Sequence, residues 1–218
     1  MIRVTGGLVI LLFLLTAQVQ ATPVSPVSYD MPNGYGQASG GTFNYWDRFY
    51  TGAGATTTDG APLSGGLGDL TDGLSATDNW FNVENVAGMG PYVGWLSIDP
   101  TITFHFIPIL DFDTVRIHFD DADGAGGVSA PLSVIINGTT FPVVDPAGAA
   151  PFFAEFDLSN LMTNQLTLQL VRGDLWVFAS EFAFTTVTAV VPEPSSFMLM
   201  GLGSVVLASL IWHRKTRG

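Results

Sequence analysis

Residues 101–120 read TITFHFIPILDFDTVRIHFD, and large apolar side chains occupy every second position in both halves of this stretch. The first apolar row is Ile102, Phe104 and Phe106, and the second is Val115, Ile117 and Phe119. Successive side chains of a β-strand point to opposite faces, so a period of two is typical of strands with one buried face. The stretch therefore predicts strands that bury these rows. His105 and His118 fall between the apolar residues, so we expect both imidazoles on the solvent side.

Further short strands follow at regular spacing along the chain. The ranges 132–136 and 140–144 flank Asn137-Gly138, a pair that accepts the positive φ values of a type I′ hairpin turn. The same pattern continues over 152–158, 166–172 and 176–184, and no amphipathic helix of useful length is predicted outside the two chain ends. Many short strands separated by Gly and Asp turns predict an all-β fold, an antiparallel β-sandwich of the jelly-roll type.

The segment 22–68 has a different composition, rich in Gly, Thr, Ser and Pro. It contains an aromatic island made of Phe43, Tyr45, Trp46, Phe49 and Tyr50. The island predicts a first strand or an edge that packs on the sandwich, and residues 51–66 are predicted to form a long loop. We expect one domain, with its sandwich over 69–190, and no separate domain before it.

The N-terminus carries the three regions of a secretory signal peptide. Arg3 supplies a positive start, residues 8–15 form an unbroken apolar core, and Val19-Gln20-Ala21 is a cleavage site of the small-residue type. Residues 1–21 are therefore predicted to be a signal peptide that is cleaved after Ala21. An uncleaved membrane anchor is the alternative.

The C-terminus combines a proline motif, an apolar run and a basic end. Val191-Pro192-Glu193-Pro194 is followed by the uncharged run 197–212 and by the basic tail 213–218. The prolines lack backbone N–H groups and break the preceding strand. The run is somewhat shorter than the roughly 20 residues that span a bilayer, but a snorkelling Arg214 extends it. The basic tail is expected to stay cytoplasmic, which places the rest of the chain across the membrane.

This order of motif, apolar helix and basic tail resembles the PEP-CTERM sorting signal of Gram-negative bacteria. The resemblance implies that residues 191–218 are recognised by an exosortase, a transpeptidase-like membrane enzyme, and cleaved near Pro192-Glu193-Pro194. It also implies a protein that is exported across the inner membrane, is transiently anchored by the helix 197–212, and then resides at the cell surface or in an exopolysaccharide and biofilm matrix. The alternative is an ordinary tail anchor whose prolines only end a strand.

The charge balance excludes nucleic acid as a partner. The chain has 7 Lys and Arg against 19 Asp and Glu, and four of the basic residues lie in the two targeting segments. Arg48, Arg116 and Arg172 remain, so the exported part has a net charge near minus sixteen. Such a surface repels nucleic acid and anionic lipid and favours cations or neutral partners such as sugars. There is no cysteine, so the domain is held by its core and not by disulfides.

The stretch from Gly68 to Trp80, GDLTDGLSATDNW, combines several oxygen ligands with a glycine that permits a sharp turn. Calcium takes about six to eight oxygens from such curled loops, and nothing here suits zinc. The stretch resembles the early loop of discoidin-like, galactose-binding-fold modules, an Asp-Gly turn followed by Thr and then Trp, which is matched with a Ser-Glu pair in the last strand. The matching residues are Asp72, Gly73, Thr77 and Trp80, with Ser180-Glu181.

The resemblance implies a galactose-binding-like sandwich with a structural calcium ion. Asp72, Thr77 and Glu181 would supply side-chain ligands, with backbone oxygens near Leu70 and Leu74. The sequence departs from the pattern in the two extra residues before Trp80 and in Leu74, which stands where an acid is usual. The alternative is a plain Asp-Gly turn with a solvated Glu181.

A second acidic cluster, DDADGAGG over residues 120–127, begins like a calcium loop. An EF-hand would need a glutamate where Pro131 stands, so we expect only a mobile rim loop with weak cation binding at most.

The sequence offers no catalytic centre, because Ser64 lacks the Gly-x-Ser-x-Gly spacing of a nucleophile elbow. Large aromatics are more often core residues, yet four of them are candidates for stacking on sugar rings: Trp80, Tyr92, Trp95 and Trp176. The sequence therefore favours a noncatalytic, exported protein that binds an exopolysaccharide or another neutral glycan. The alternatives are a secreted glycoside hydrolase or other matrix-processing enzyme, and a purely structural surface role.

Overall fold

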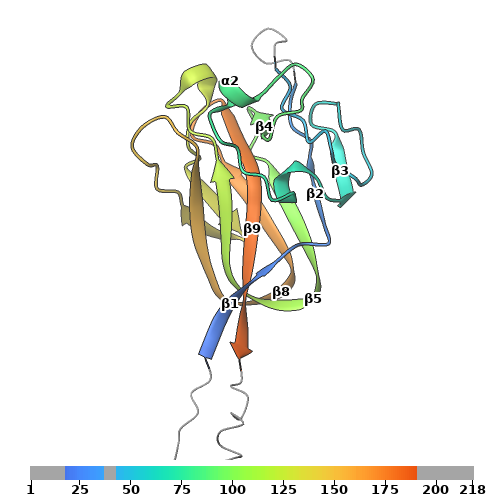
Figure 1. Ribbon diagram of the computed structural model, residues 1–218, viewed down its shortest axis with the longest axis vertical. Coiled ribbons are helices and arrows are strands. Elements are labelled where there is room, and N and C mark those ends of the chain that lie inside the picture. The colour runs from blue at the N-terminus through green and yellow to red at the C-terminus, as the bar shows by residue number, and fades with distance from the viewer. Residues whose placement is uncertain (1–17, 37–42, 191–218) are drawn as a thin grey trace, which may run out of the picture. The chain divides into compact units, whose positions relative to one another are not determined.

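Both apolar rows of residues 101–120 lie in one long strand, β5 (Thr101–Phe119), of a computed structural model that describes residues 18–36 and 43–190 (Figure 1). Its regular pairing with β8 (Phe152–Val171) is interrupted between His105 and Leu110, where four residues of β5 stand opposite Asn164 alone. Figure 1 shows β5 and β8 curving together at the lower end of the molecule. We refer to these two curved segments, residues 106–111 of β5 and 161–164 of β8, as the two bends.

Within the described ranges the strands form a nine-stranded sheet whose main path is β1, β9, β5, β8, β6 and β7. The bounds are β1 (Gln18–Val24), β6 (Ser133–Ile136), β7 (Thr139–Pro142) and β9 (Trp176–Val190). Off this path, β2 (Ser28–Pro32) pairs with β5 and with β3 (Pro62–Gly66), and β4 (Val93–Leu96) pairs with β9. The following neighbouring strands pair in antiparallel fashion: β5 with β2, β8 and β9; β2 with β3; β4 with β9; and β6 with β7 and β8.

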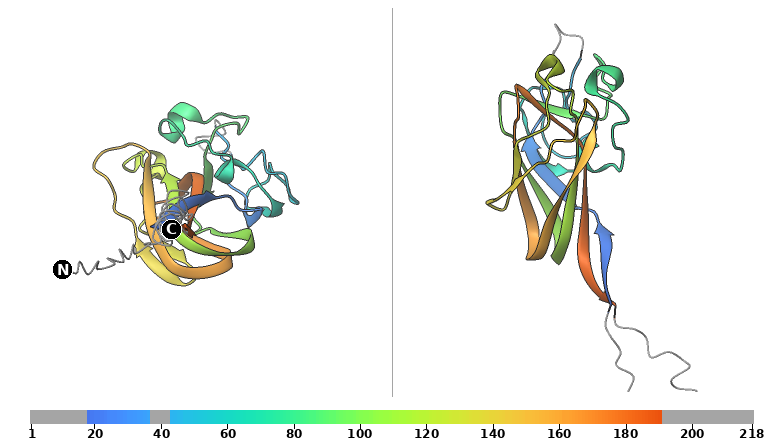
Figure 2. Two further views of the ribbon diagram at one scale, coloured as in Figure 1. Left: turned by 60° about the horizontal axis from the view of Figure 1, so that its bottom comes forward. Right: turned by 90° about the vertical axis from the view of Figure 1, so that its left-hand side faces the viewer.

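The two halves of β5 belong to two layers. The first half pairs with β2, where Phe104 stands opposite Tyr29, and the second half pairs with β9, where Val115 stands opposite Phe184. The Phe104 ring nevertheless lies 4.9 Å from that of Phe184, so the two halves face each other across the core. Figure 2 shows the strands curving around this interior. The predicted all-β antiparallel sandwich is confirmed.

The core contains every member of the two predicted apolar rows, each at most 1% exposed. A second, smaller cluster packs at the opposite end from the two bends, and its largest members are Tyr45, Trp80, Tyr92, Trp176 and Phe178. Three short helices of the described residues lie among the loops: η1 (Asp69–Thr71), α2 (Trp80–Val83) and η2 (Ala125–Gly127).

The predicted Asn137-Gly138 hairpin is present between β6 and β7. Both residues have positive φ values, 46° and 86°, and Ile136 pairs with Thr139 across the turn. A left-handed backbone at two successive positions is what a type I′ turn requires, and Gly138 adopts it without steric cost.

The segment 22–68 is part of the same compact unit, which spans Ala21–Val187. It contributes β2 and β3, so the end of the predicted loop 51–66 is in fact a short edge strand. The aromatic island packs on the sandwich, which is one of the two expected outcomes. Of its five residues, only Phe43 forms a β-bridge.

The predicted signal-peptide core, the motif from Val191 to Pro194 and the apolar run 197–212 lie outside the described residues. Among the residues that are described, no helix is long and apolar enough to span a bilayer. β1 crosses the predicted cleavage position after Ala21, so only its last three residues would belong to an exported chain.

Replacing Phe104 by Ala is expected to reduce the free energy of unfolding by about 3–5 kcal/mol, because it opens a cavity between the two layers. The Phe104 ring lies about 5 Å from those of Phe182 and Phe184. Chemical denaturation of residues 22–190 measures the change. Val144→Ala, at a side chain that is 83% exposed, should change it by less than about 0.5 kcal/mol.

Candidate functional site

The stretch 69–83, which we call the early loop, lies against β9. The backbone N–H of Gly73 donates a hydrogen bond to Glu181 Oε2 at 3.0 Å, and that of Ala76 donates to Ser180 Oγ at 3.1 Å. More than 100 residues of chain separate the partners of each bond. The structure thus brings together the two parts of the sequence that carry the discoidin-like resemblance.

Asp72 and Glu181 lie close enough to repel each other. Burial raises the pKa of Glu181 to about 7, the charge of Asp72 adds to the rise, and the hydrogen bond from Gly73 opposes it. Asp72 is exposed, and its Oδ1 accepts a hydrogen bond from the N–H of Leu74 at 2.8 Å, which closes a local turn. A cation beside both carboxylates would offset this repulsion.

The third predicted ligand, Thr77, is not brought into this arrangement. Its side chain is exposed, and in the described part of the chain no hydrogen bond joins it to Asp72 or Glu181. No three Asp, Glu or His side chains within residues 18–36 and 43–190 form a metal-binding group. A calcium ion would therefore need backbone oxygens in addition to Asp72 and Glu181, and the site stays a prediction.

His118 is buried, which contradicts the expectation of a solvent-side imidazole. It is 5% exposed, its Nδ1 lies 2.7 Å from Ser180 Oγ, and its ring packs edge-on against Phe153. The reason is that the early loop and Phe153 cover this face of β5 and β9. Burial lowers the pKa of His118. Ser180 has no exposed surface, so this Ser-His pair gives a substrate no access.

His105 conforms better to the expectation. Its side chain is 34% exposed, and its Nε2 lies at hydrogen-bond distance, 2.8 Å, from Asp30 Oδ2 on β2.

The four aromatic residues predicted to stack on sugars are at most 8% exposed, so that prediction is wrong. The Tyr45 ring lies 5.2 Å from Trp176, and Trp80 is edge-on to Phe43 at 5.4 Å. Tyr92 has no exposed surface, and Trp95 donates from Nε1 to the carbonyl of Pro32. Neighbouring protein atoms occupy the ring surface that a sugar would need.

The second acidic cluster, residues 120–127, was expected to be a mobile rim loop, but two of its carboxylates are buried and hold loops in place. Asp120 is fully buried, and its two oxygens accept hydrogen bonds from Asn79 Nδ2 and from the N–H of Trp80, both at 2.9 Å. Asp121 Oδ1 accepts from the N–H groups of Asp123 and Ala130. These carboxylates hold the end of the early loop and their own rim loop in place.

A hollow of about 310 Å³ opens beside the early loop. Phe49, which is 53% exposed, forms one wall, and the other lining residues are Thr51, Leu67, Gly68, Asp69, Thr71 and Asp72. Asp69 Oδ2 and Thr71 Oγ1 are buried and have no hydrogen-bond partner within the described part of the chain. Of this lining, the exposed Phe49 ring and the exposed Asp72 carboxylate suit a ligand that is flat on one side and rich in hydroxyl groups.

Asp69 has a second buried acid behind it. The N–H of Asp69 donates to Asp47 Oδ1 at 3.1 Å, and Tyr29 donates to Asp47 Oδ2. Burial raises the pKa of Asp69 to about 8, and Asp47 adds to the rise. At neutral pH the Asp69 carboxyl is therefore largely protonated and can donate as well as accept a hydrogen bond.

Sequence reasoning missed Phe49, Asp69 and Thr71 as site residues. Asp69 and Thr71 lie inside the quoted stretch 68–80, and their position beside the Asp-Gly turn was the available signal. Nothing in the sequence marked Phe49 as the exposed member of the aromatic island.

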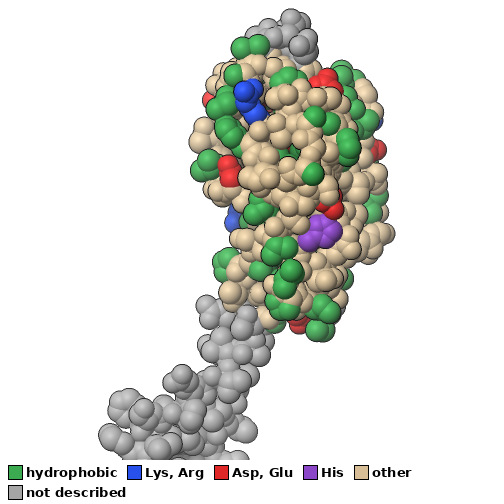
Figure 3. All heavy atoms as spheres, turned by 90° about the vertical axis from the view of Figure 1, so that its right-hand side faces the viewer, with side chains coloured by type: hydrophobic (Ala, Val, Ile, Leu, Met, Phe, Trp, Pro, Cys, Tyr) green, Lys and Arg blue, Asp and Glu red, His purple; other side chains and the backbone are tan. Residues whose placement is uncertain are grey.

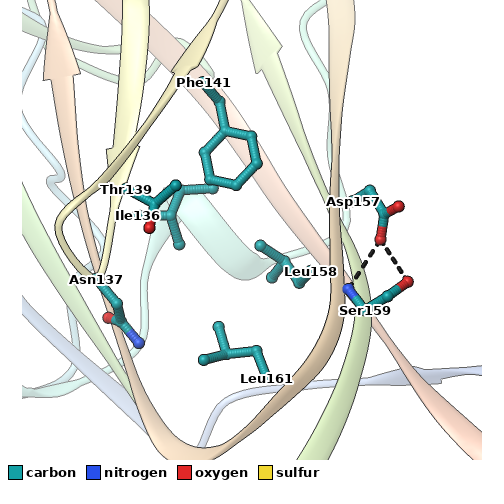
Figure 4. A pocket seen from close by; sticks show the side chains of 8 residues that line it. All are labelled: Ile136, Asn137, Thr139, Phe141, Asp157, Leu158, Ser159 and Leu161. Atoms are coloured by element: carbon teal, nitrogen blue, oxygen red, sulfur yellow. Dashed lines mark hydrogen bonds between the residues drawn. The ribbon is translucent and has the colours of Figure 1, made fainter.

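A second hollow, of about 270 Å³, lies between the β6–β7 hairpin and β8 (Figure 4). Half of its lining residues are apolar, namely Ile136, Phe141, Leu158 and Leu161, and the Asp157 carboxylate already accepts hydrogen bonds from the N–H and hydroxyl of Ser159. The one aromatic ring in this lining, Phe141, is only partly exposed, so the hollow is a poorer match for a sugar.

Two family comparisons match this chain. Residues 26–123 match the family described as discoidin domain-containing receptor 1/2, DS-like domain, and residues 190–215 match the PEP-CTERM protein-sorting motif. The chain therefore carries a PEP-CTERM sorting motif behind a discoidin-like domain, as both resemblances implied. The sorting motif indicates export and sorting to the cell surface.

Several solved structures show a distant similarity. They include a CBM32 module of AlyQ in complex with 4,5-unsaturated mannuronic acid, at 12% identity and a TM-score of 0.31 over 43% of this chain and 75% of that one. A GH31 CBM32-2 module bound to GalNAc has 11% identity and a TM-score of 0.35 over 78% and 97%. A family 32 module of C. perfringens NanJ in complex with galactose has 10% identity and a TM-score of 0.30 over 51% and 90%.

Glu84 should make the unfolding free energy depend on pH. Burial raises its pKa to about 8 from an ordinary value of 4.5, so the folded protein keeps a proton that the unfolded chain loses between these values. The free energy of unfolding should therefore fall as pH rises through this window and level off above it. Glu84→Gln should reduce the slope by at most about 1.4 kcal/mol per pH unit in denaturation curves. Glu155→Gln, which removes an exposed carboxylate, is the matched control.

Proposed function

We propose that the protein is a noncatalytic, carbohydrate-binding component of the extracellular matrix that reaches the cell surface through exosortase processing. The sorting motif at residues 190–215 supports the route, and processing near Pro192-Glu193-Pro194 would separate the domain from the membrane segment. The strongly acidic composition favours a neutral glycan over an anionic one.

The Phe49 hollow is the observation that carries this proposal. Carbohydrates present an apolar ring face that stacks on aromatic side chains and hydroxyl groups that pair with polar atoms. Phe49 offers the first surface, and the exposed Asp72 carboxylate, which lines the same hollow, offers the second.

Phe49→Ala should weaken retention of residues 22–190 on the host's own exopolysaccharide by about tenfold, because one stacked ring contributes on the order of 1 kcal/mol or more. Affinity electrophoresis or pull-down measures retention. Phe81→Ala is the matched control, since the Phe81 ring is 44% exposed but does not line the hollow. Equal loss in both variants, or no retention of the wild-type fragment, would contradict the proposal.

The same incubation distinguishes a binding protein from the alternative enzyme. Release of new reducing ends that disappears on changing one specific acid would identify a glycoside hydrolase. Burial of both Ser180 and His118 supports the noncatalytic role.

We also propose a structural calcium ion held by Asp72, Glu181 and nearby backbone oxygens, with Thr77 as a ligand only if its side chain turns inward. The repulsion between Asp72 and the buried Glu181 supports this proposal. The ion would fasten the early loop to β9 and so support the floor of the adjacent hollow, which Asp72 also lines.

Calcium should raise the melting temperature of residues 22–190 by several degrees, and a chelator should reverse the rise, because a ligand that binds only the folded state stabilises it. Glu181→Gln should abolish the response, whereas Glu155→Gln should keep it. An unchanged wild-type midpoint with calcium and with chelator would remove Asp72 and Glu181 from the site.

A further inference from the structure

Three of the most exposed large apolar side chains lie at the two bends. Ile107 is 78% exposed, Ile109 is 62% exposed and Met162 is 71% exposed. Figure 3 shows apolar side chains at this lower end, among others spread over the same face. Neither cavity described above includes these three residues.

The sheet register places the three residues at the same end of β5 and β8. Met162 stands opposite Asp111, and Leu110 stands opposite Thr163, so the β8 bend faces the β5 bend directly. Ile107 and Ile109 lie in the irregular stretch just before Leu110. We call Ile107, Ile109 and Met162 the apolar tip.

Both ends of the compact unit leave from the same place. Phe112, one residue beyond the β5 bend, pairs with Leu161 on one side and with Thr186 on the other. Thr186 Oγ1 in turn donates to the carbonyl of Thr22 at 3.3 Å. The first and last residues of the unit, Ala21 and Val187, are therefore neighbours of the apolar tip.

We propose that the apolar tip docks on the outer surface of the bilayer while the C-terminal segment is still attached. This inference rests on the proposed membrane anchor. Nine residues separate Val187 from Phe197, where the apolar run begins. They span at most about 30 Å when fully extended, so an anchored chain holds this end of the domain within reach of the lipid.

The charges around the apolar tip determine whether it prefers zwitterionic or anionic lipid. Asp111, Asp113 and Asp157 lie on the adjoining stretches of β5 and β8, and residues 106–113 and 157–164 contain no Lys or Arg. The tip therefore inserts through apolar contact into zwitterionic lipid and is repelled by anionic headgroups. A basic membrane-binding surface would behave in the opposite way.

The absence of native cysteine permits a direct test on the full chain. Ile109→Cys and Met162→Cys, each labelled with an environment-sensitive dye, are reconstituted into phosphatidylcholine vesicles that carry a nitroxide at a shallow acyl position. Both dyes should shift to the blue and lose at least half of their fluorescence to the lipid quencher. The same dye on Val144→Cys, beyond β7 at the opposite end of the domain, should show neither effect.

The apolar contact and the lipid preference are tested in the same vesicles. Ile107→Asp should reduce quenching at position 162 by about tenfold, and replacing a third of the lipid by phosphatidylglycerol should reduce it roughly threefold. Stronger quenching on anionic lipid would overturn the proposal.

The remaining outcomes separate the two proposals. A full chain that fails to float with the vesicles refutes the anchor and the docking together. A chain that floats while the dyes at 109 and 162 remain unquenched refutes the docking alone. A blue shift without lipid quenching also refutes the docking. If dilution with unlabelled protein removes the shift, the tip is covered by a second copy of the chain. If dilution leaves the shift unchanged, the tip is covered by the chain's own apolar run.

Discussion

The fold depends on the pairing of both halves of β5 with β8 while the other edge of β5 changes partner from β2 to β9. A single strand cannot lie in two facing layers unless it curves, and its neighbour must curve with it. The break in pairing between His105 and Leu110 provides this curvature. Once the two halves of β5 face each other, Phe104 meets Phe182 and Phe184, and the core of the sandwich follows.

The early loop adds a second level of organisation on the outer face of β9. Its bonds to Ser180 and Glu181 position Asp72, and the hydrogen bonds to Asp120 fix its far end at Trp80. The cost is a set of buried carboxylates in an already acidic domain, with raised pKa values at Asp69, Glu84 and Glu181. Such groups favour a cation, a proton or a hydroxyl-bearing partner, and a buried unpaired acid is an expensive feature to keep for stability alone.

The features that could be predicted from the sequence are those encoded locally. Alternation over residues 101–119 identified the buried rows, because adjacent side chains of a strand necessarily point to opposite faces. The Asn137-Gly138 turn was predictable for the same reason, since two residues determine its geometry. The pairing of the early loop with Ser180-Glu181 in the last strand could be expected only from a family resemblance.

The features that could not be predicted depend on contacts between distant segments. Alternation shows which side chains share a face of β5, but it does not show that the early loop covers His118. Trp80 and Trp176 are buried because Phe43 and Tyr45 arrive from the N-terminal segment. The burial of Asp69 likewise depends on Asp47, 22 residues earlier in the chain. Composition alone could not distinguish these rings and acids from exposed ones.

The position of β9 at the end of the domain has a consequence for the timing of folding. A chain that is exported from its N-terminus delivers β9 after every other strand. Until then the second half of β5 has an open edge, the apolar rows lack their facing layer, and the early loop has no surface to cover. Open edges and exposed apolar rows promote misassembly. The domain can therefore close only as its last strand emerges, which makes completion of transport and completion of folding nearly the same event.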